Sequence, residues 1–193
     1  MNRPADIVPF SFDLSSLVRR SVASLYSHLV TRPTGRALRV GIESQIGEIG
    51  SVCLSVLDFA QVVVLDYSCA DEAVAKLIQR YQFADRPADA YFVARGLGEQ
   101  HREPIDAVLR RHELALVAEV EGDYVLLGAA DELDCLTWDG LQRIHAGPPH
   151  QVAHAAGIDR DAAAAALERL ALRRVVLRVD DSAYHALTTS LPA

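Results

Sequence analysis

Cysteine is scarce in this sequence, and no long apolar run occurs in it. The 193 residues include three cysteines, Cys53, Cys69 and Cys135, which are odd in number and not clustered. They indicate reduced thiols in a cytoplasmic protein and not a disulfide framework. No apolar run approaches the ~20 residues of a membrane-spanning helix, and the N-terminus lacks the charged lead and apolar core of a signal peptide. We therefore expect a cytoplasmic protein without membrane contact.

Positive charge is limited as well, and motifs of catalysis are missing. The formal net charge is −7, which gives no overall attraction to nucleic acid or anionic lipid. There is no glycine-rich phosphate loop, no Gly-x-Ser-x-Gly motif and no spaced carboxylate pair. His150 and His154 have the spacing of a metal-binding pair, but no acidic or cysteine-rich partner completes a known site. The sequence predicts no enzymatic activity, no metal and no cofactor.

One stretch organises what the sequence does contain. Half of the residues are hydrophobic, enough for a sizeable core. The apolar run Val62–Leu65 predicts a strand buried on both faces. It ends at Asp66, and Ser68 then stands where a helix N-cap is expected, with Asp71 and Glu72 in the first helical turn. This strand, tight turn and capped helix predict the start of an α/β unit.

The same residues resemble the anti-sigma-factor antagonist (STAS) domain. Its Asp-Ser-Ser-Gly signature ends a strand and opens a helix, and the matching residues here are Asp66-Tyr67-Ser68-Cys69. Leu57-Asp58-Phe59, Thr31-Arg32 and Ala70-Asp71-Glu72 are similar to the STAS-like domains of unassigned function. The match covers roughly Leu29 to Gly128. It implies an α/β fold, a STAS-like sheet with flanking helices.

Periodicity predicts the elements of this first domain, residues 1–130. Leu14 to Leu29 has helical spacing, although its last residues also alternate like a strand. Alternating strands and helices follow, and the domain closes on a hairpin around Glu121-Gly122-Asp123. The expected elements after Thr31 are a helix through Ile46, strand Val52–Asp58, helix Ala70–Gln82, strand Ala90–Val93, a turn at Gly96-Leu97-Gly98, helix Glu103–Arg111, and strands Leu114–Val120 and Tyr124–Leu127.

Residues 131–193 predict a second domain with its own core. Two helices separated by Gly157, a left-handed cap, lead to a hairpin around Asp180-Asp181-Ser182. Helix, helix–turn–helix and hairpin together resemble a winged helix, which implies a C-terminal winged-helix domain. The expected elements are helices Trp138–Ile144, His150–Ala156 and Arg160–Arg174, capped by Asp159, and strands Val175–Val179 and Ala183–Leu187.

Ser68 is the first candidate site, together with Asp66, Asp71 and Glu72. In the STAS family the matching serine receives phosphate from a partner kinase, and phosphorylation releases a bound protein. Positive potential at a helix start is compatible with a phosphate there. The alternative is a plain helix cap, because the same acids are typical of a capped first turn.

Five arginines of the second domain are candidates for nucleic-acid binding: Arg160, Arg169, Arg173, Arg174 and Arg178. In winged helices the start of the second motif helix reads bases, but here that start is rich in alanine. Acids outnumber arginines after residue 130, and Asp180-Asp181 makes the hairpin tip acidic. Protein binding or dimerisation is therefore the favoured use of this domain.

We expect a non-enzymatic regulatory adaptor that binds a protein partner through the STAS-like domain and is switched by phosphorylation at Ser68. The partner would be a kinase-like ATPase or another regulator. The alternative is a transcription regulator that uses the winged helix on DNA. A third class, a sensor of a small anion or nucleotide near Ser68, also stays open, because a fold alone does not select a function.

Overall fold

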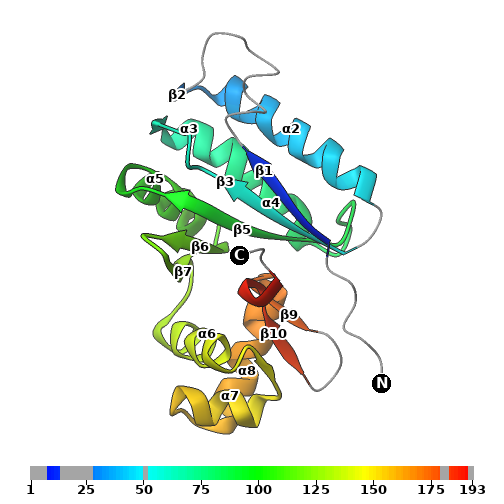
Figure 1. Ribbon diagram of the computed structural model, residues 1–193, viewed down its shortest axis with the longest axis vertical. Coiled ribbons are helices and arrows are strands. Elements are labelled where there is room, and N and C mark those ends of the chain that lie inside the picture. Colours follow the sequence, from blue (N-terminus) through cyan, green and yellow to red (C-terminus); the bar gives the residue numbers. More distant parts are fainter. Residues whose placement is uncertain (1–7, 14–27, 50–51, 179–182, 191–193) are drawn as a thin grey trace.

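The computed structural model describes residues 8–13, 28–49, 52–178 and 183–190. A five-stranded sheet with the order β1-β3-β5-β6-β7 forms its centre (Figure 1). The first four strands run parallel, and β7 pairs antiparallel with β6. The strands are β1 (Val8–Asp13), β3 (Cys53–Asp58), β5 (Ala90–Leu97), β6 (Ala115–Val120) and β7 (Asp123–Gly128). Strands alternating with helices confirm the expected α/β class.

Helices cover one face of this sheet. Alternate strand residues, such as Leu57, Phe92 and Leu116, pack against them in one hydrophobic cluster. The helical segments are α2 (Arg32–Ile49), α3 (Tyr67–Ala70), the π-helical turn η1 (Asp71–Ala75), α4 (Lys76–Gln82) and α5 (Glu99–Arg111). No helix in the described part of the chain is long and apolar enough to cross a membrane.

The C-terminal segment covers the opposite face. Its helices are α6 (Glu132–Ile144), α7 (Pro149–Ala156) and α8 (Arg160–Leu172). A small antiparallel sheet of order β8-β10-β9 and the 3-10 turn η2 (Leu187–Ser190) complete it; the strands are β8 (Ala146–Gly147), β9 (Val176–Arg178) and β10 (Tyr184–Ala186). As predicted, Gly157 is left-handed, with φ 69°, and Asp159 caps α8.

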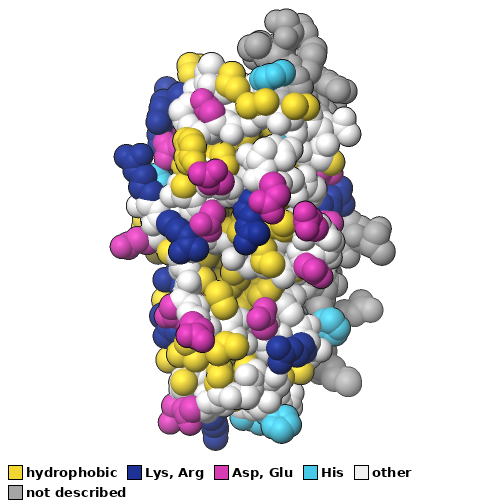
Figure 2. Space-filling model, turned by 90° about the vertical axis from the view of Figure 1, so that its left-hand side faces the viewer, with side chains coloured by type: hydrophobic (Ala, Val, Ile, Leu, Met, Phe, Trp, Pro, Cys, Tyr) yellow, Lys and Arg dark blue, Asp and Glu magenta, His cyan; other side chains and the backbone are white. Residues whose placement is uncertain are grey.

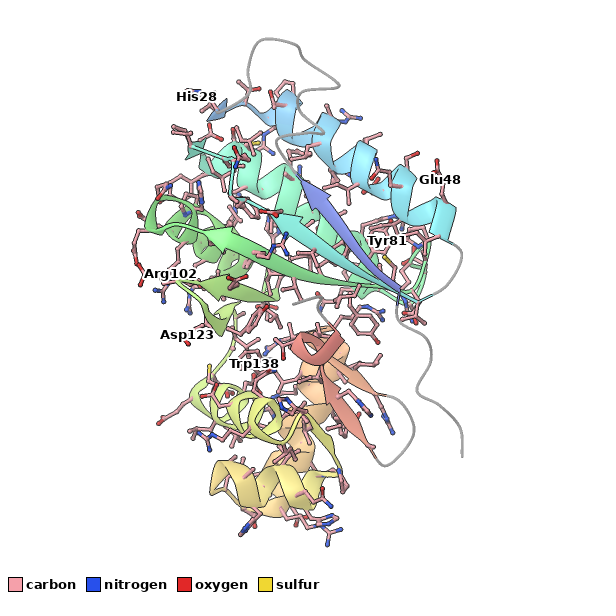
Figure 3. The ribbon with its side chains drawn as sticks, viewed as in Figure 1. His28, Glu48, Tyr81, Arg102, Asp123 and Trp138 are labelled. Atoms are coloured by element: carbon pink, nitrogen blue, oxygen red, sulfur yellow. The ribbon has the colours of Figure 1, made fainter. Side chains whose placement is uncertain are left out.

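Residues of both halves of the chain meet in one buried apolar cluster. Leu54, Tyr91 and Val117 of the sheet belong to the same buried cluster as Trp138 and Leu141 of α6. Trp138, labelled in Figure 3, lies between the sheet and the C-terminal helices. The physical reason is that β3, β5 and β6 are apolar on both faces, so the face without α2–α5 needs its own cover.

The strand expected at Val62–Leu65 is wrong in extent and burial. Only β4 (Val64–Leu65) is extended, and it pairs with the two residues of β2 (His28–Leu29) outside the central sheet. Val62 and Leu65 are buried, whereas Val63 and Val64 face solvent. A short apolar run does not distinguish a central strand from a half-exposed edge. The helix expected from Leu14 to Leu29 lies mostly on residues 14–27, outside the described residues, and its last two residues, His28–Leu29, form β2.

Candidate functional site

The turn after β4 is held by Asp66 and not by Ser68. Asp66 is the N-cap of α3: its backbone is extended, and its Oδ1 accepts from the backbone N–H of Cys69 at 2.7 Å. Ser68 lies inside the helix, and its Oγ donates to Oδ1 of Asp66 at 3.0 Å. The predicted Ser68 cap is therefore wrong. The helix starts two residues earlier because a carboxylate at position 66 caps as well as a hydroxyl does.

Asp71 and Glu72 point into the protein and not into solvent as first-turn acids would. Both residues are buried, and both belong to the π-helical turn η1 between α3 and α4. Lys76 closes this turn by donating its backbone N–H to the carbonyl oxygen of Asp71, five residues back. Such wide turns often occur at functional sites. Buried carboxylates also need partners, since an isolated buried charge is very costly.

Four basic side chains surround these two acids. Nη1 of Arg32 donates to Asp71 Oδ2 at 2.8 Å and to Glu72 Oε1 at 2.9 Å. Nε2 of His112 lies 2.7 Å from Asp71 Oδ1. Lys76 contacts both carboxylates, and Arg39 Nη2 lies 3.6 Å from Glu72 Oε2. The cluster therefore joins α2, η1, α4 and the end of α5 through charged side chains.

The partners decide the charge of the two acids. Burial alone would raise the pKa of Asp71, but hydrogen bonds from His112 and Arg32 outweigh it and lower that pKa below its ordinary value. For Glu72, hydrogen bonds from Lys76 and Arg32 outweigh burial in the same way and lower its pKa. Both carboxylates are thus ionised at neutral pH, and each is neutralised by more than one cation.

A glycine allows α2 to approach closely enough for this cluster. A Cβ atom at Gly35 would lie 2.7 Å from the carbonyl oxygen of Cys69 and 3.0 Å from Cβ of Glu72. Arg32 and Arg39 are three residues before and four after Gly35, so they lie on the same face of α2. The close contact at Gly35 therefore sets the position of α2 relative to α3 and η1, and so brings both guanidinium groups within reach of the acids.

A pocket of about 270 Å³ opens beside the cluster. Ser68 and Asp71 line it from the helix after β4, and Ala107, Val108 and Arg111 line it from α5. Arg32 and Tyr67 complete the wall. Arg32 is half-exposed, and Arg111 forms no ion pair with any described residue. A hydroxyl and two accessible guanidinium groups therefore meet in one cavity.

Exposed apolar side chains occur on and beside the short strands β2 and β4 and at the start of α3. Val63 is 56% exposed and Tyr67 is 50% exposed, and Val30 and Val64 are exposed as well. These residues come from β2, β4, α3 and the residues beside them. Figure 2 shows hydrophobic side chains at the upper end of this side of the molecule and also along its middle and lower part. The hydroxyl of Tyr67 is fixed by Glu103 of α5, to which it donates at 2.8 Å.

Four of the five candidate nucleic-acid arginines form ion pairs within the chain. Arg169 and Arg173 both donate to Asp134, whose side chain is 1% exposed. Arg178 contacts Glu168 at 3.1 Å, and Arg160 is exposed at the start of α8.

Arg174 joins the two halves of the chain instead. Its Nε donates to the carbonyl oxygen of Ala90 at 2.8 Å, its Nη2 contacts Asp89, and its guanidinium lies over the Tyr91 ring at 4.0 Å. The ion pair with Asp89 neutralises its charge, and the Tyr91 ring covers one face of its guanidinium group. The candidate arginine is therefore a structural link between α8 and the start of β5.

The sequence reasoning singled out Ser68, Asp66, Asp71 and Glu72, which the structure brings together, but it missed their partners. Arg32 was noted only as part of the resemblance, and Arg39, Lys76, Arg111 and His112 gave no signal alone. No group of three or more His, Cys, Asp or Glu side chains that could hold a metal occurs among the described residues. Comparisons with protein-family models, curated proteins and solved structures give no match to this chain.

Proposed function

We propose that this protein is a regulatory adaptor that binds a protein partner at the surface around Ser68, and that phosphorylation of Ser68 controls this binding. The observation that carries the proposal is the placement of Ser68. It lines a pocket together with Tyr67 and two guanidinium groups, and the exposed Val63 and Val64 precede it in the chain. Exposed apolar groups near a modifiable hydroxyl are suited to a switchable protein interface.

The finer fold assignment belongs to this proposal. A sheet with helices on one face and a turn opened by Asp66 supports the STAS-like reading of residues 1–130. Helices α6–α8 followed by the β9–β10 hairpin, with β8 pairing to β10, support the winged-helix reading of residues 131–193. The cytoplasmic location and the kinase-like partner are part of the same proposal.

Site-specific photo-cross-linking in cells that express the chain natively tests the proposal. A photoreactive amino acid replaces Tyr67 in one variant and Arg160 in another, and cross-linked proteins are identified by mass spectrometry. One protein captured at position 67 and not at position 160, together with phosphate on Ser68, is the expected result. Capture of that protein at position 160 only, or phosphate on other residues only, would contradict the proposal.

The DNA-binding alternative has less support from the contacts of the arginines. Arg169 and Arg173 donate to Asp134, and Arg174 donates to Asp89 and the backbone of Ala90, so part of their positive charge is already neutralised within the chain. We expect a selection from random duplexes at near-physiological salt to enrich no motif. A single enriched motif bound at ~10⁻⁸ M or tighter, as specific regulators bind, would make DNA binding the better proposal.

A further inference from the structure

The hydroxyl of Ser68 has an acid on one side and cations on the other. It donates to Asp66, which is itself fixed as the helix cap by the N–H of Cys69. A phosphoryl group on Ser68 Oγ removes this hydrogen bond and places a charge of about −1.5 to −2 beside the Asp66 carboxylate. The repulsion directs the phosphate away from Asp66 and into the pocket, where Arg32 and Arg111 are the basic side chains of the lining.

Arg32 can leave Asp71 and Glu72 without leaving either buried carboxylate unpaired. Asp71 would keep its contacts with Lys76 and His112, and Glu72 would keep Lys76 and Arg39. The Arg32 side chain is 52% exposed, so its movement meets little packing resistance. A phosphate also offers three acceptor oxygens and more charge than one carboxylate, and a guanidinium binds it through two parallel hydrogen bonds.

We propose, on the basis of the function proposed above, that phosphorylated Ser68 is bound by Arg32 and Arg111, and that Arg32 exchanges Asp71 and Glu72 for the phosphate. The phosphoryl group comes from a nucleoside triphosphate through a protein kinase. A bond forms between Ser68 Oγ and phosphorus, the bond from phosphorus to the bridging oxygen breaks, and the nucleoside diphosphate leaves. The hydroxyl proton passes to solvent.

This exchange links the phosphate to the apolar surface. Arg32 is the first residue of α2, and the chain just before it contains β2 and the exposed Val30. The close packing at Gly35 holds the body of α2 against α3. Arg32 therefore joins the proposed phosphate site to the start of α2, directly after the β2–β4 pair that carries the exposed Val64.

Phosphoserine installed during translation tests the exchange without a kinase or partner. The phosphate is placed at position 68 or, as a control, at Ser44, which is exposed on α2. Its second pKa, ordinarily about 6, is followed by phosphorus NMR. We expect a value lower by about 0.5–1 pH unit at position 68, because opposite charges favour the dianion. Arg32→Gln and Arg111→Gln should each remove part of this difference, and Arg36→Gln, on an exposed neighbour, should not.

The groups around the phosphate include the imidazole of His112, which contacts Asp71. The groups of α2 and α4 are Arg32 and Lys76. Asp66 caps α3, Tyr67 begins it, and Asp71 and Glu72 belong to η1. Glu103 and Arg111 lie on α5, and His112 follows it. The titration is therefore repeated with His112→Gln, and the difference between positions 68 and 44 should persist.

A phosphate that titrates alike at positions 68 and 44, or one that neither arginine substitution affects, overturns the exchange. The comparison of the two positions needs no arginine variant, so it decides the question even if a variant fails to fold. An arginine-dependent shift without any partner captured at position 67 would support the exchange while the adaptor function fails. A partner captured at position 67 without the pKa shift of the phosphate would support the adaptor function, while the exchange fails.

Discussion

Removing all residues after 130 is expected to unfold the first half of the chain. The truncation uncovers four large side chains that are buried in the shared cluster, namely Leu54, Tyr91, Val93 and Val117. Burial of one such side chain contributes roughly 1.5–3 kcal/mol, so the four together contribute about 6–12 kcal/mol as an upper estimate. This loss is similar to the whole free energy of unfolding of an ordinary domain, about 5–15 kcal/mol.

The full chain offers a direct assay of this coupling, because Trp138 is its one tryptophan. Trp138 belongs to the shared cluster, so its fluorescence reports the C-terminal half, whereas far-UV circular dichroism reports both halves. We expect a single urea transition with the same midpoint for both signals. Two separated transitions, or a monomeric fragment 1–130 that unfolds cooperatively at the midpoint of the full chain, would refute the shared core.

Four further substitutions and a change of pH have defined outcomes in the same urea assay. Asp134→Ala should lower the free energy of unfolding by about 2–4 kcal/mol, because it leaves Arg169 and Arg173 without their buried acceptor. As a control, Asp139→Ala at an exposed position should change the free energy of unfolding by less than about 0.5 kcal/mol. Equal effects of the two substitutions would contradict the role of Asp134. Asp66→Ala should cost about 0.5–2 kcal/mol as a lost helix cap, and Ser68→Ala should cost less; the reverse order would restore Ser68 as the cap. Acidification should lower the free energy of unfolding for two reasons. Burial lowers the pKa of His101 below its ordinary 6.5. The basic partners of Asp71 and Glu72 lower the pKa of Asp71 below 3.8 and the pKa of Glu72 below 4.5. In each case the unfolded chain binds more protons, so stability falls first below about pH 6.5 and again below about pH 4.5; a loss of stability on raising the pH through this range would contradict these assignments.

Local signals predicted much of the fold. The alternation of strands and helices, the hairpin at Glu121-Gly122-Asp123 and the left-handed Gly157 all depend on neighbouring residues, and all occur as expected. The strands expected at Val52–Asp58 and Ala90–Val93 occur as β3 and the first half of β5, but β5 continues to Leu97, into the turn expected at Gly96-Leu97-Gly98. Their sequence did not indicate what covers the second face, because that contact joins residues more than eighty positions apart, such as Tyr91 and Arg174.

The candidate site shows how a small local error changes an interpretation. A helix start at Ser68 placed Asp71 and Glu72 in an exposed first turn, where acids favour the helix dipole. The start at Tyr67 and the wide turn that follows make the same residues buried acceptors. Their partners Arg32 and His112 lie about forty residues away in either direction. Sequence spacing does not reveal such pairs, although two neighbouring acids in an apolar helix are a reason to look for them.

The π-helical turn at Asp71–Ala75 makes the long helix behave as if one residue had been inserted into it. In a regular α-helix each residue advances about 1.5 Å and turns about 100°. A π-helical turn spreads one helical turn over one additional residue, so the parts of the helix before and after it face about as they would in a regular helix. Deleting Ala73 would therefore leave Leu77 and Ile78 in the core. It would narrow the turn that holds both Asp71 and Glu72 inside the protein.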